Sequence, residues 1–224
     1  MKLLHTVSLI ITALFTNNLM AQDTVDEKPS KFSPGVDFYS SYIWRGSKQG
    51  TGPAVQPYLE FNTGGLTIGA WGSFDASGFS ETDLYAIYSL PFGLSLGLTD
   101  YYYPDLDYFD YSDSTGSHAF ELTAGYEIEG LSLSANVILN QAGGIGSVGG
   151  DIYLEAAYSF KYFGIFLGAG NGWTTSDGDF AVCNIGIKAE KEIKITNNFS
   201  IPLNGQVIFN PDKKSLYVVV GFSL

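Results

Sequence analysis

The sequence of 224 residues is poor in cysteine, in basic residues and in charge of either sign. The single cysteine, Cys183, excludes an intramolecular disulfide framework and a cysteine-based zinc site. Only 11 Lys and Arg accompany 23 Asp and Glu, which gives a formal charge of −12. Such an acid excess excludes a nucleic-acid partner, because binding to phosphate requires clustered bases. Aromatic residues make up 15% of the chain, which excludes a disordered protein.

Long apolar runs are also absent. The apolar stretch Val7–Phe15 is much shorter than the ~20 residues of a membrane-spanning helix. Lys2 before it and Ala21 after it are typical of a secretory signal peptide over residues 1–21, with an N-terminal membrane anchor as the alternative. Cleavage after Ala21 leaves 10 bases and 23 acids, a charge of −13. The polar residues 22–34 are predicted to be a disordered lead-in to one domain, residues 35–224.

The remainder of the chain alternates between apolar and polar residues. In the segment 131–139, Leu131, Leu133 and Val137 fall on one face, whereas Ser132 and Asn136 fall on the other. This period of two predicts β-strands with one apolar face. Twelve strands are predicted, at 35–45, 54–62, 66–74, 82–90, 94–103, 119–128, 131–140, 151–160, 163–171, 181–193, 199–209 and 215–223.

The predicted connections alternate between short and long. The short ones are 63–65, 91–93, 129–130, 161–162 and 194–198, and the longer polar ones are 46–53, 75–81, 104–118, 141–150, 172–180 and 210–214. Tight turns at one end and longer loops at the other are typical of a bacterial outer-membrane barrel, with periplasmic turns and extracellular loops. The sequence therefore predicts an all-β, transmembrane, antiparallel up-and-down β-barrel of about 12 strands, with the lead-in and both termini in the periplasm.

The predicted outward faces carry no charged residue at mid-strand, and Asp100 and Lys191 lie on them only near strand ends. This pattern fits a face in contact with lipid, where a base at mid-bilayer costs ~2–4 kcal/mol. Outward aromatic residues near strand ends predict two interfacial girdles, made of Tyr42, Trp44, Phe61, Phe74, Phe120, Phe160, Phe163, Phe199, Phe209 and Phe222. The alternative is a soluble β-sandwich or lipocalin-like barrel, whose outward face would be polar.

This location in the outer membrane of a Gram-negative cell implies several partners. They are outer-membrane lipid, lipopolysaccharide and the barrel-assembly machinery. This machinery typically recognises a closing strand of the kind that ends this chain, in which Val218, Val220, Phe222 and Leu224 alternate with other residues. The sequence implies no cofactor.

The segment Ser41–Gln56 resembles the first hairpin of the TorF-type porin family of short outer-membrane barrels. The matching residues are Tyr42, Trp44, Arg45, Gly46, Gln49, Pro53, Ala54, Val55 and Gln56. The segment Asp100–Pro104, with three consecutive tyrosines, is similar to the family's mid-chain strand. The resemblance is specific over about sixteen residues and implies the fold and the compartment more than transport.

The inward face is predicted to be acidic and to line a pore. Its acids are Asp37, Glu60, Asp83, Glu121, Glu127, Glu155, Glu190 and Glu192, and its bases are Arg45 and Lys188, a formal charge of −6. Such a lumen favours cations. Bulky inward side chains would narrow it, namely Tyr39, Tyr58, Trp71, Tyr85, Tyr101, Tyr103 and Tyr153. The alternative is that carboxylates pair with Arg45 and Lys188 as struts across a mostly closed barrel.

The candidates for pore lining or a constriction are Arg45, Glu60, Trp71, Asp83, Glu121, Glu155, Lys188 and Glu190. Arg45 is predicted at the extracellular end of the first strand, where it would anchor the next loop or form one side of a constriction. The sequence thus predicts a narrow passive channel for small cationic or neutral polar solutes and no enzymatic activity.

Two further functions stay open. One is a structural or adhesive barrel that conducts nothing. The other is a lipid-modifying enzyme based on His118, but its neighbour Ser117 is a poor partner because adjacent strand residues face opposite sides. In the loop 104–118, Asp105, Asp107, Asp110 and Asp113 offer oxygen ligands for Ca²⁺, although the loop lacks the glycine and terminal glutamate of an EF-hand.

Overall fold

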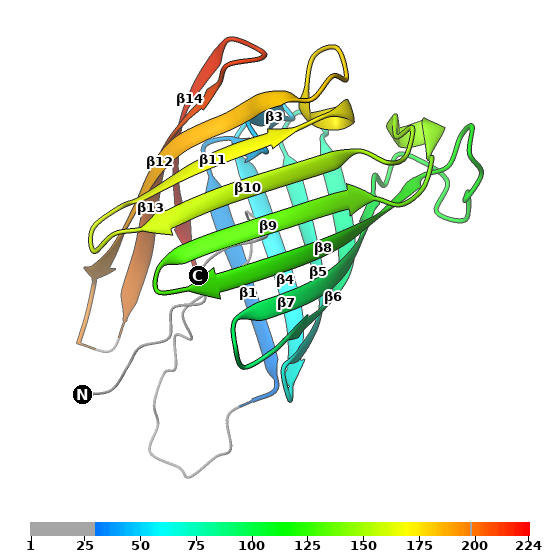
Figure 1. The fold of residues 1–224 in the computed structure, drawn as a ribbon. Coiled ribbons are helices and arrows are strands. Elements are labelled where there is room, and N and C mark those ends of the chain that lie inside the picture. Colours follow the sequence, from blue (N-terminus) through cyan, green and yellow to red (C-terminus); the bar gives the residue numbers. More distant parts are fainter. Residues whose placement is uncertain (1–29, 198) are drawn as a thin grey trace.

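The computed structural model describes residues 30–197 and 199–224, so the predicted signal peptide and most of the lead-in lie outside the described residues. The described chain forms a closed antiparallel barrel of twelve strands, in the order β1-β14-β13-β12-β11-β10-β9-β8-β7-β6-β5-β4 (Figure 1). The predicted all-β barrel and its strand number are therefore confirmed.

The wall strands lie close to their predicted positions. They are β1 (Phe32–Tyr39), β4 (Ala54–Thr63), β5 (Leu66–Asp75), β6 (Ser80–Ser89), β7 (Leu94–Tyr102), β8 (His118–Ile128), β9 (Leu131–Ile138), β10 (Ile152–Ser159), β11 (Gly164–Gly170), β12 (Ala181–Lys194), β13 (Ser200–Asn210) and β14 (Ser215–Ser223). Two single-turn 3₁₀ helices, η1 (Gly143–Ile145) and η2 (Gly172–Thr174), lie in the longer loops. Among the described residues, no helix is both long and apolar enough to span a bilayer.

The alternation in the sequence becomes an apolar exterior and a polar interior. Leu133 on β9 and Leu154 on β10 point outward and are exposed, whereas Ser132, Asn136 and Tyr153 on the same strands are buried. A period of two places neighbouring residues on opposite faces of a strand. The outward face of this isolated chain is therefore its apolar face, the reverse of a soluble barrel.

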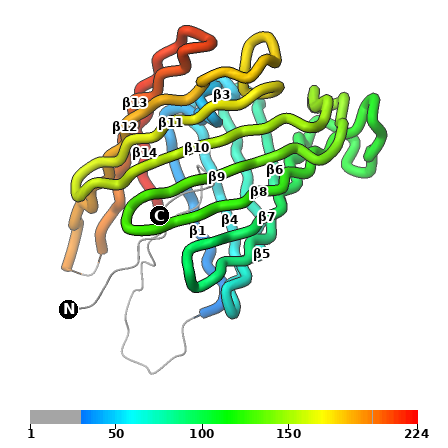
Figure 2. The backbone as a smooth tube through the Cα atoms, in the orientation of Figure 1, coloured from blue at the N-terminus to red at the C-terminus, as the bar shows by residue number. Residues whose placement is uncertain are grey.

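The connections divide the barrel into two ends. The tight turns, such as Glu129–Gly130 between β8 and β9, lie at one end, which we call the turn end. The connections after β5, β7, β9, β11 and β13 lie at the other, the loop end, and those after β7, β9 and β11 are the long ones (Figure 2). The predicted alternation of short and long connections is present at β7, β9 and β11, whereas the connections after β5 and β13 are as short as the one between β6 and β7.

The first predicted strand, 35–45, is wrong in its extent. The wall strand β1 begins at Phe32 and stops at Tyr39, and the chain then leaves the wall. Residues Tyr42–Trp44 (β2) and Ser47–Gln49 (β3) pair with each other as a separate two-stranded sheet, which we call the inner hairpin. β1 therefore pairs with β14 over only three residue pairs, from Asp37–Ser223 to Tyr39–Gly221.

The predicted girdle is wrong at Tyr42 and Trp44, because the inner hairpin carries both residues into the lumen. A second difference lies in β12, where the register shifts opposite Gly168 and Ala169. This β-bulge leaves Cys183 and Asn184 both buried, although adjacent residues of a regular strand face opposite sides.

Candidate functional site

The inner hairpin turns at Arg45 and Gly46, and both residues have positive φ, 48° and 78°. A two-residue hairpin turn with both φ values positive is the type I′ turn, which matches the twist of its strands. Gly46 is also required for space, because a Cβ atom there would lie 1.9 Å from the carbonyl oxygen of Cys183. The Arg-Gly pair of the sequence motif is therefore the turn that brings the hairpin against β12.

The hairpin contacts the inner wall on three sides. Tyr42 packs edge-on against Trp71 with ring centroids 5.5 Å apart, in a cluster that includes Tyr58 and Tyr85. Ile43 packs against Ile208 and Val219 of the opposite wall.

On the third side, the ring of Trp44 meets those of Tyr101 and Trp173 at 5.8 and 6.1 Å. Two hydrogen bonds hold the turn itself: the Asn210 side-chain amide donates to the Gly46 carbonyl, and Lys213 Nζ donates to Ser47 Oγ. The inner hairpin therefore crosses the bore near the loop end.

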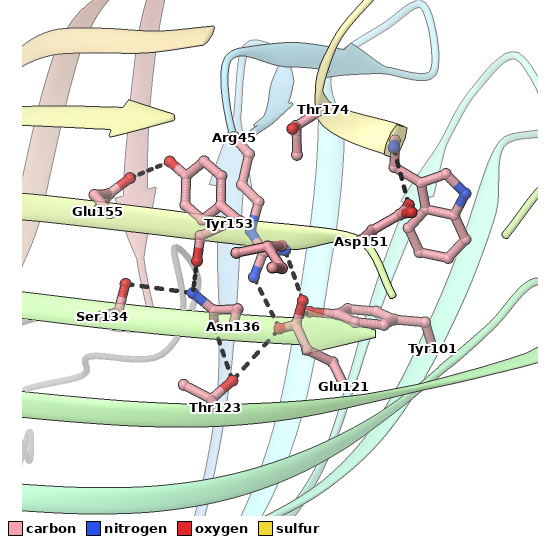
Figure 3. Close-up of polar contacts among 12 residues, drawn as sticks. Arg45, Tyr101, Glu121, Thr123, Ser134, Asn136, Asp151, Tyr153, Glu155 and Thr174 are labelled. Atoms are coloured by element: carbon pink, nitrogen blue, oxygen red, sulfur yellow. Dashed lines mark hydrogen bonds and ion pairs between the residues drawn. The ribbon is translucent and has the colours of Figure 1, made fainter. Parts of the chain in front are cut away.

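Arg45 forms the central ion pair of this region with Glu121 of β8 (Figure 3). Its Nη1 and Nη2 atoms lie 2.6 and 2.8 Å from the two carboxylate oxygens. The two side chains are only 9% and 3% exposed. The guanidinium also stacks 4.5 Å from the Trp44 ring and 4.4 Å from the Tyr153 ring. Bidentate pairing between two aromatic faces fixes the position of the charge, since both the direction and the plane of the guanidinium are determined.

Polar side chains from neighbouring strands extend this ion pair into a network. Tyr101 and Thr123 hydroxyls donate to Glu121, and Thr123 also bonds to Asn136, whose amide donates to the Tyr153 carbonyl. On the other side, the Tyr153 hydroxyl donates to Glu155, and the Asn184 amide donates to both of these groups. Predicted residues Arg45, Glu121 and Glu155 are therefore joined in one hydrogen-bonded layer across the bore.

A second group of predicted residues lies beside Tyr42. Trp71 of β5 is directly opposite Asp83 of β6, and both are buried. Glu81, two residues before Asp83, shares its inward face and is 3% exposed. The predicted loop ended at Glu81, so the sequence reasoning missed this residue. Glu81 is two residues from Asp83, so on one strand both face the same side, and this spacing is the sequence signal that could have found Glu81.

Nearer the turn end, the lumen is more open and remains acidic. Glu60 accepts a hydrogen bond from the Tyr85 hydroxyl, at 2.8 Å. Lys188 feels the charges of Glu190, Glu155 and Glu127, and Glu190 is exposed to solvent. With Glu81 included, the inward acids of the described lumen outnumber the inward bases Arg45, Lys188 and Lys194, so its net charge is negative.

His118 lies on the outward face of β8, where the loop between β7 and β8 covers it. Its Nδ1 atom is 2.9 Å from Asp100, and its Nε2 atom is 2.6 Å from the Tyr108 carbonyl oxygen. The hydroxyl of Ser117 donates to loop carbonyls instead. The imidazole therefore joins the loop, through Nε2, to the wall, where Nδ1 contacts Asp100 of β7, and no described nucleophile is hydrogen-bonded to it.

The acids of the same loop bind their own backbone. Asp107 accepts from the Phe109 amide, and Asp110 accepts from Ser112 and Thr115. The hydrogen bonds from Thr115 and Ser112 lower the pKa of Asp110. Among the described residues, no group of three or more His, Cys, Asp or Glu is arranged to hold a metal ion.

A family model of bacterial proteins of unknown function, named Gcw_chp, matches residues 23–199. The chain belongs to this family. The match spans the inner hairpin, the ion pair and all wall strands up to β12. This match does not confirm the resemblance to the TorF-type porin family. No curated protein matches the chain.

Among solved structures, this Gcw_chp member is similar to an engineered mutant of the Rh. blastica porin, with a TM-score of 0.40 and 15% identity over 76% of this chain and 55% of the porin. It is also similar to a variant of OccD1 (OprD), with a TM-score of 0.36 and 14% identity over 86% of this chain and 65% of that one. The chain thus spans less than two thirds of the length of either porin.

Proposed function

We propose that this chain is an outer-membrane channel whose bore is narrowed by the inner hairpin. The observation that carries the proposal is a closed barrel with an apolar exterior and an acidic interior. In a bilayer, every backbone group must be paired within the protein, and a closed barrel with this polarity is one of the two folds that achieve it. The outer membrane of a Gram-negative cell follows as its location, with the loop end outside and the turn end in the periplasm.

The proposed solutes are small cations and small neutral polar molecules. Acids outnumber bases in the described lumen, and a low-dielectric wall concentrates their field on the pore. The hairpin, together with Tyr101 and Tyr153, leaves no wide passage at the loop end. The candidates for the constriction are Arg45, Glu121 and Glu155 on one side of the hairpin and Trp71 and Asp83 on the other.

A non-conducting barrel is the second candidate, and the same hairpin favours it. Four separate contacts fix the hairpin: the Arg45 ion pair, the Asn210 and Lys213 hydrogen bonds, and the Ile43 packing. If all four persist, the barrel has a structural or adhesive role. The enzymatic alternative loses its support, because the second nitrogen of His118 is already bonded to the Tyr108 carbonyl.

The proposal is tested by conductance of the purified full chain in planar bilayers. We expect discrete conductance steps, and in a gradient of KCl a reversal potential of the sign given by K⁺ permeation. The absence of steps from a folded, heat-modifiable barrel would establish the non-conducting alternative. A reversal potential of the opposite sign would refute the role of the lumen acids. The same proposal includes a signal peptide, membrane lipids and the assembly machinery as partners, and kinship with TorF-type porins.

A further inference from the structure

Glu81 and Asp83 are two buried acids without a base. Their residues are 3% and 6% exposed, and in each carboxylate one oxygen is out of solvent contact with no hydrogen-bond partner among the described residues. The charges that act most strongly on Asp83 are those of Glu81, Asp100 and Glu121, all negative. Arg45, the base at the turn of the inner hairpin, is already bound bidentately to Glu121.

A positively charged partner would stabilise this buried pair of carboxylates. Taking a carboxylate out of water is costly unless a counter-charge and hydrogen bonds replace the lost hydration. The hydrogen bonds present are few: the Tyr42 hydroxyl bonds to Glu81, and a backbone bond from Tyr102 reaches Asp83. They satisfy one side of each carboxylate and leave the other free.

The surroundings of the pair are aromatic. Trp71 is directly opposite Asp83, and the Tyr42 ring lies 5.5 Å from Trp71 and 6.2 Å from Phe79. Phe79 in turn lies 6.1 Å from Tyr103. Aromatic faces attract cations through the ring quadrupole, most strongly where water is excluded. A positive group here would therefore have carboxylates on one side and ring faces on the other.

The same features limit the kind of cation. A divalent metal needs six or more oxygen ligands, or a tighter cluster than the described residues provide. A primary ammonium group has three N–H donors for the free carboxylate oxygens and a compact charge for the rings.

We propose that Glu81 and Asp83, with the rings of Trp71 and Tyr42, form a binding site for a primary ammonium group, either free ammonium or the charged end of a small alkylamine. The inner hairpin covers this site through Tyr42, so the ligand and the hairpin share one surface. The physiological role of the site rests on the proposed channel, because its ligand must enter through the lumen.

The test is a titration of purified full-length barrel with methylammonium chloride, followed by tryptophan fluorescence because Trp71 lies beside Asp83. KCl and tetramethylammonium chloride at equal ionic strength are the comparison salts. We expect a saturable change in tryptophan fluorescence with methylammonium and not with the comparison salts. The methylammonium concentration at half-saturation should rise by about tenfold or more in Asp83→Asn and Glu81→Gln. The matched control is Asp179→Asn, which removes an exposed loop acid. Heat-modifiable migration on gels verifies that each variant is folded.

Three outcomes would overturn the site: no saturable change in the folded wild type, equal response to KCl, or unchanged half-saturation in Asp83→Asn. Conductance is recorded on the same preparations. A barrel that binds methylammonium without conducting refutes the channel and leaves the site intact. A barrel that conducts without binding refutes the site alone.

Discussion

The ion pair between Arg45 and Glu121 makes the sharpest prediction, because it joins the inner hairpin to the wall. We consider Arg45→Ala, which removes both hydrogen bonds of 2.6 and 2.8 Å and leaves Glu121 buried without a base. Breaking a buried ion pair by removing one partner costs about 3–5 kcal/mol. Glu121 keeps its hydrogen bonds from Tyr101 and Thr123, so the lower end of this range applies.

A cost of about 3 kcal/mol changes the ratio of seated to released hairpin on the order of 100-fold, since 1.4 kcal/mol is tenfold. Loss of stacking on Trp44 and Tyr153 adds to the effect. Single-channel recording in planar bilayers should therefore show larger or longer openings in Arg45→Ala than in the wild type. The lost positive charge should also strengthen the preference for cations.

Two controls separate the ion pair from the charge alone. Arg45→Lys keeps the charge but loses the bidentate geometry and should fall between wild type and Arg45→Ala. Lys194→Ala removes an exposed base at the turn end and should leave the openings unchanged. Glu121→Gln should resemble Arg45→Ala, and the double variant should add little to either single change. Unchanged openings in folded Arg45→Ala would refute the view that this ion pair holds the constriction.

Three other variants test separate parts of the structure. Gly46→Ala places a Cβ atom 1.9 Å from the Cys183 carbonyl oxygen, at a φ that costs ~1–2 kcal/mol without glycine, so openings should increase as in Arg45→Ala. Gly178→Ala has similar φ but open space, and should have no effect on them. Glu190→Gln removes one negative charge from the lumen, so the reversal potential in a KCl gradient should shift toward zero; no shift would contradict an electrostatic role for the lumen. His118→Ala removes ring stacking at 5.0 and 4.6 Å on Tyr102 and Tyr111, so chymotrypsin should cut the loop roughly tenfold faster with conductance unchanged. Equal cutting rates would refute the role of His118 in holding the loop between β7 and β8.

The wall could be predicted from the sequence because its signals are local. Alternation over nine residues and a turn such as Glu129–Gly130 involve only neighbouring residues, and they place a strand whatever the rest of the chain does. The inner hairpin could not be predicted in this way, since Tyr42–Trp44 continues the alternation of β1. Its position depends on Glu121, 76 residues from Arg45, and on Cys183 beside Gly46.

The candidate site shows the same division. Parity alone assigned Asp83, Glu121 and Glu155 to the interior, and the structure places all three there. Parity cannot say which acids acquire a base, because that depends on contacts across the bore. Arg45 therefore points inward as predicted, but it lies on the inner hairpin and not on the first wall strand. Glu81 is missing from the predicted inward acids because β6 begins two residues earlier than predicted.

The inner hairpin and the barrel seam are two consequences of one departure from the wall. Continued past Tyr39–Gly221, the register of β1 and β14 would place Ser41 opposite Val219 and Arg45 opposite Ser215. The described chain forms no such pairs beyond Ser40 and Val220, so this edge of β14 lacks its wall partner. Instead, Ile43 packs against Val219 from inside. The short seam between β1 and β14 and the hairpin seated in the lumen thus both follow from the end of β1 at Tyr39.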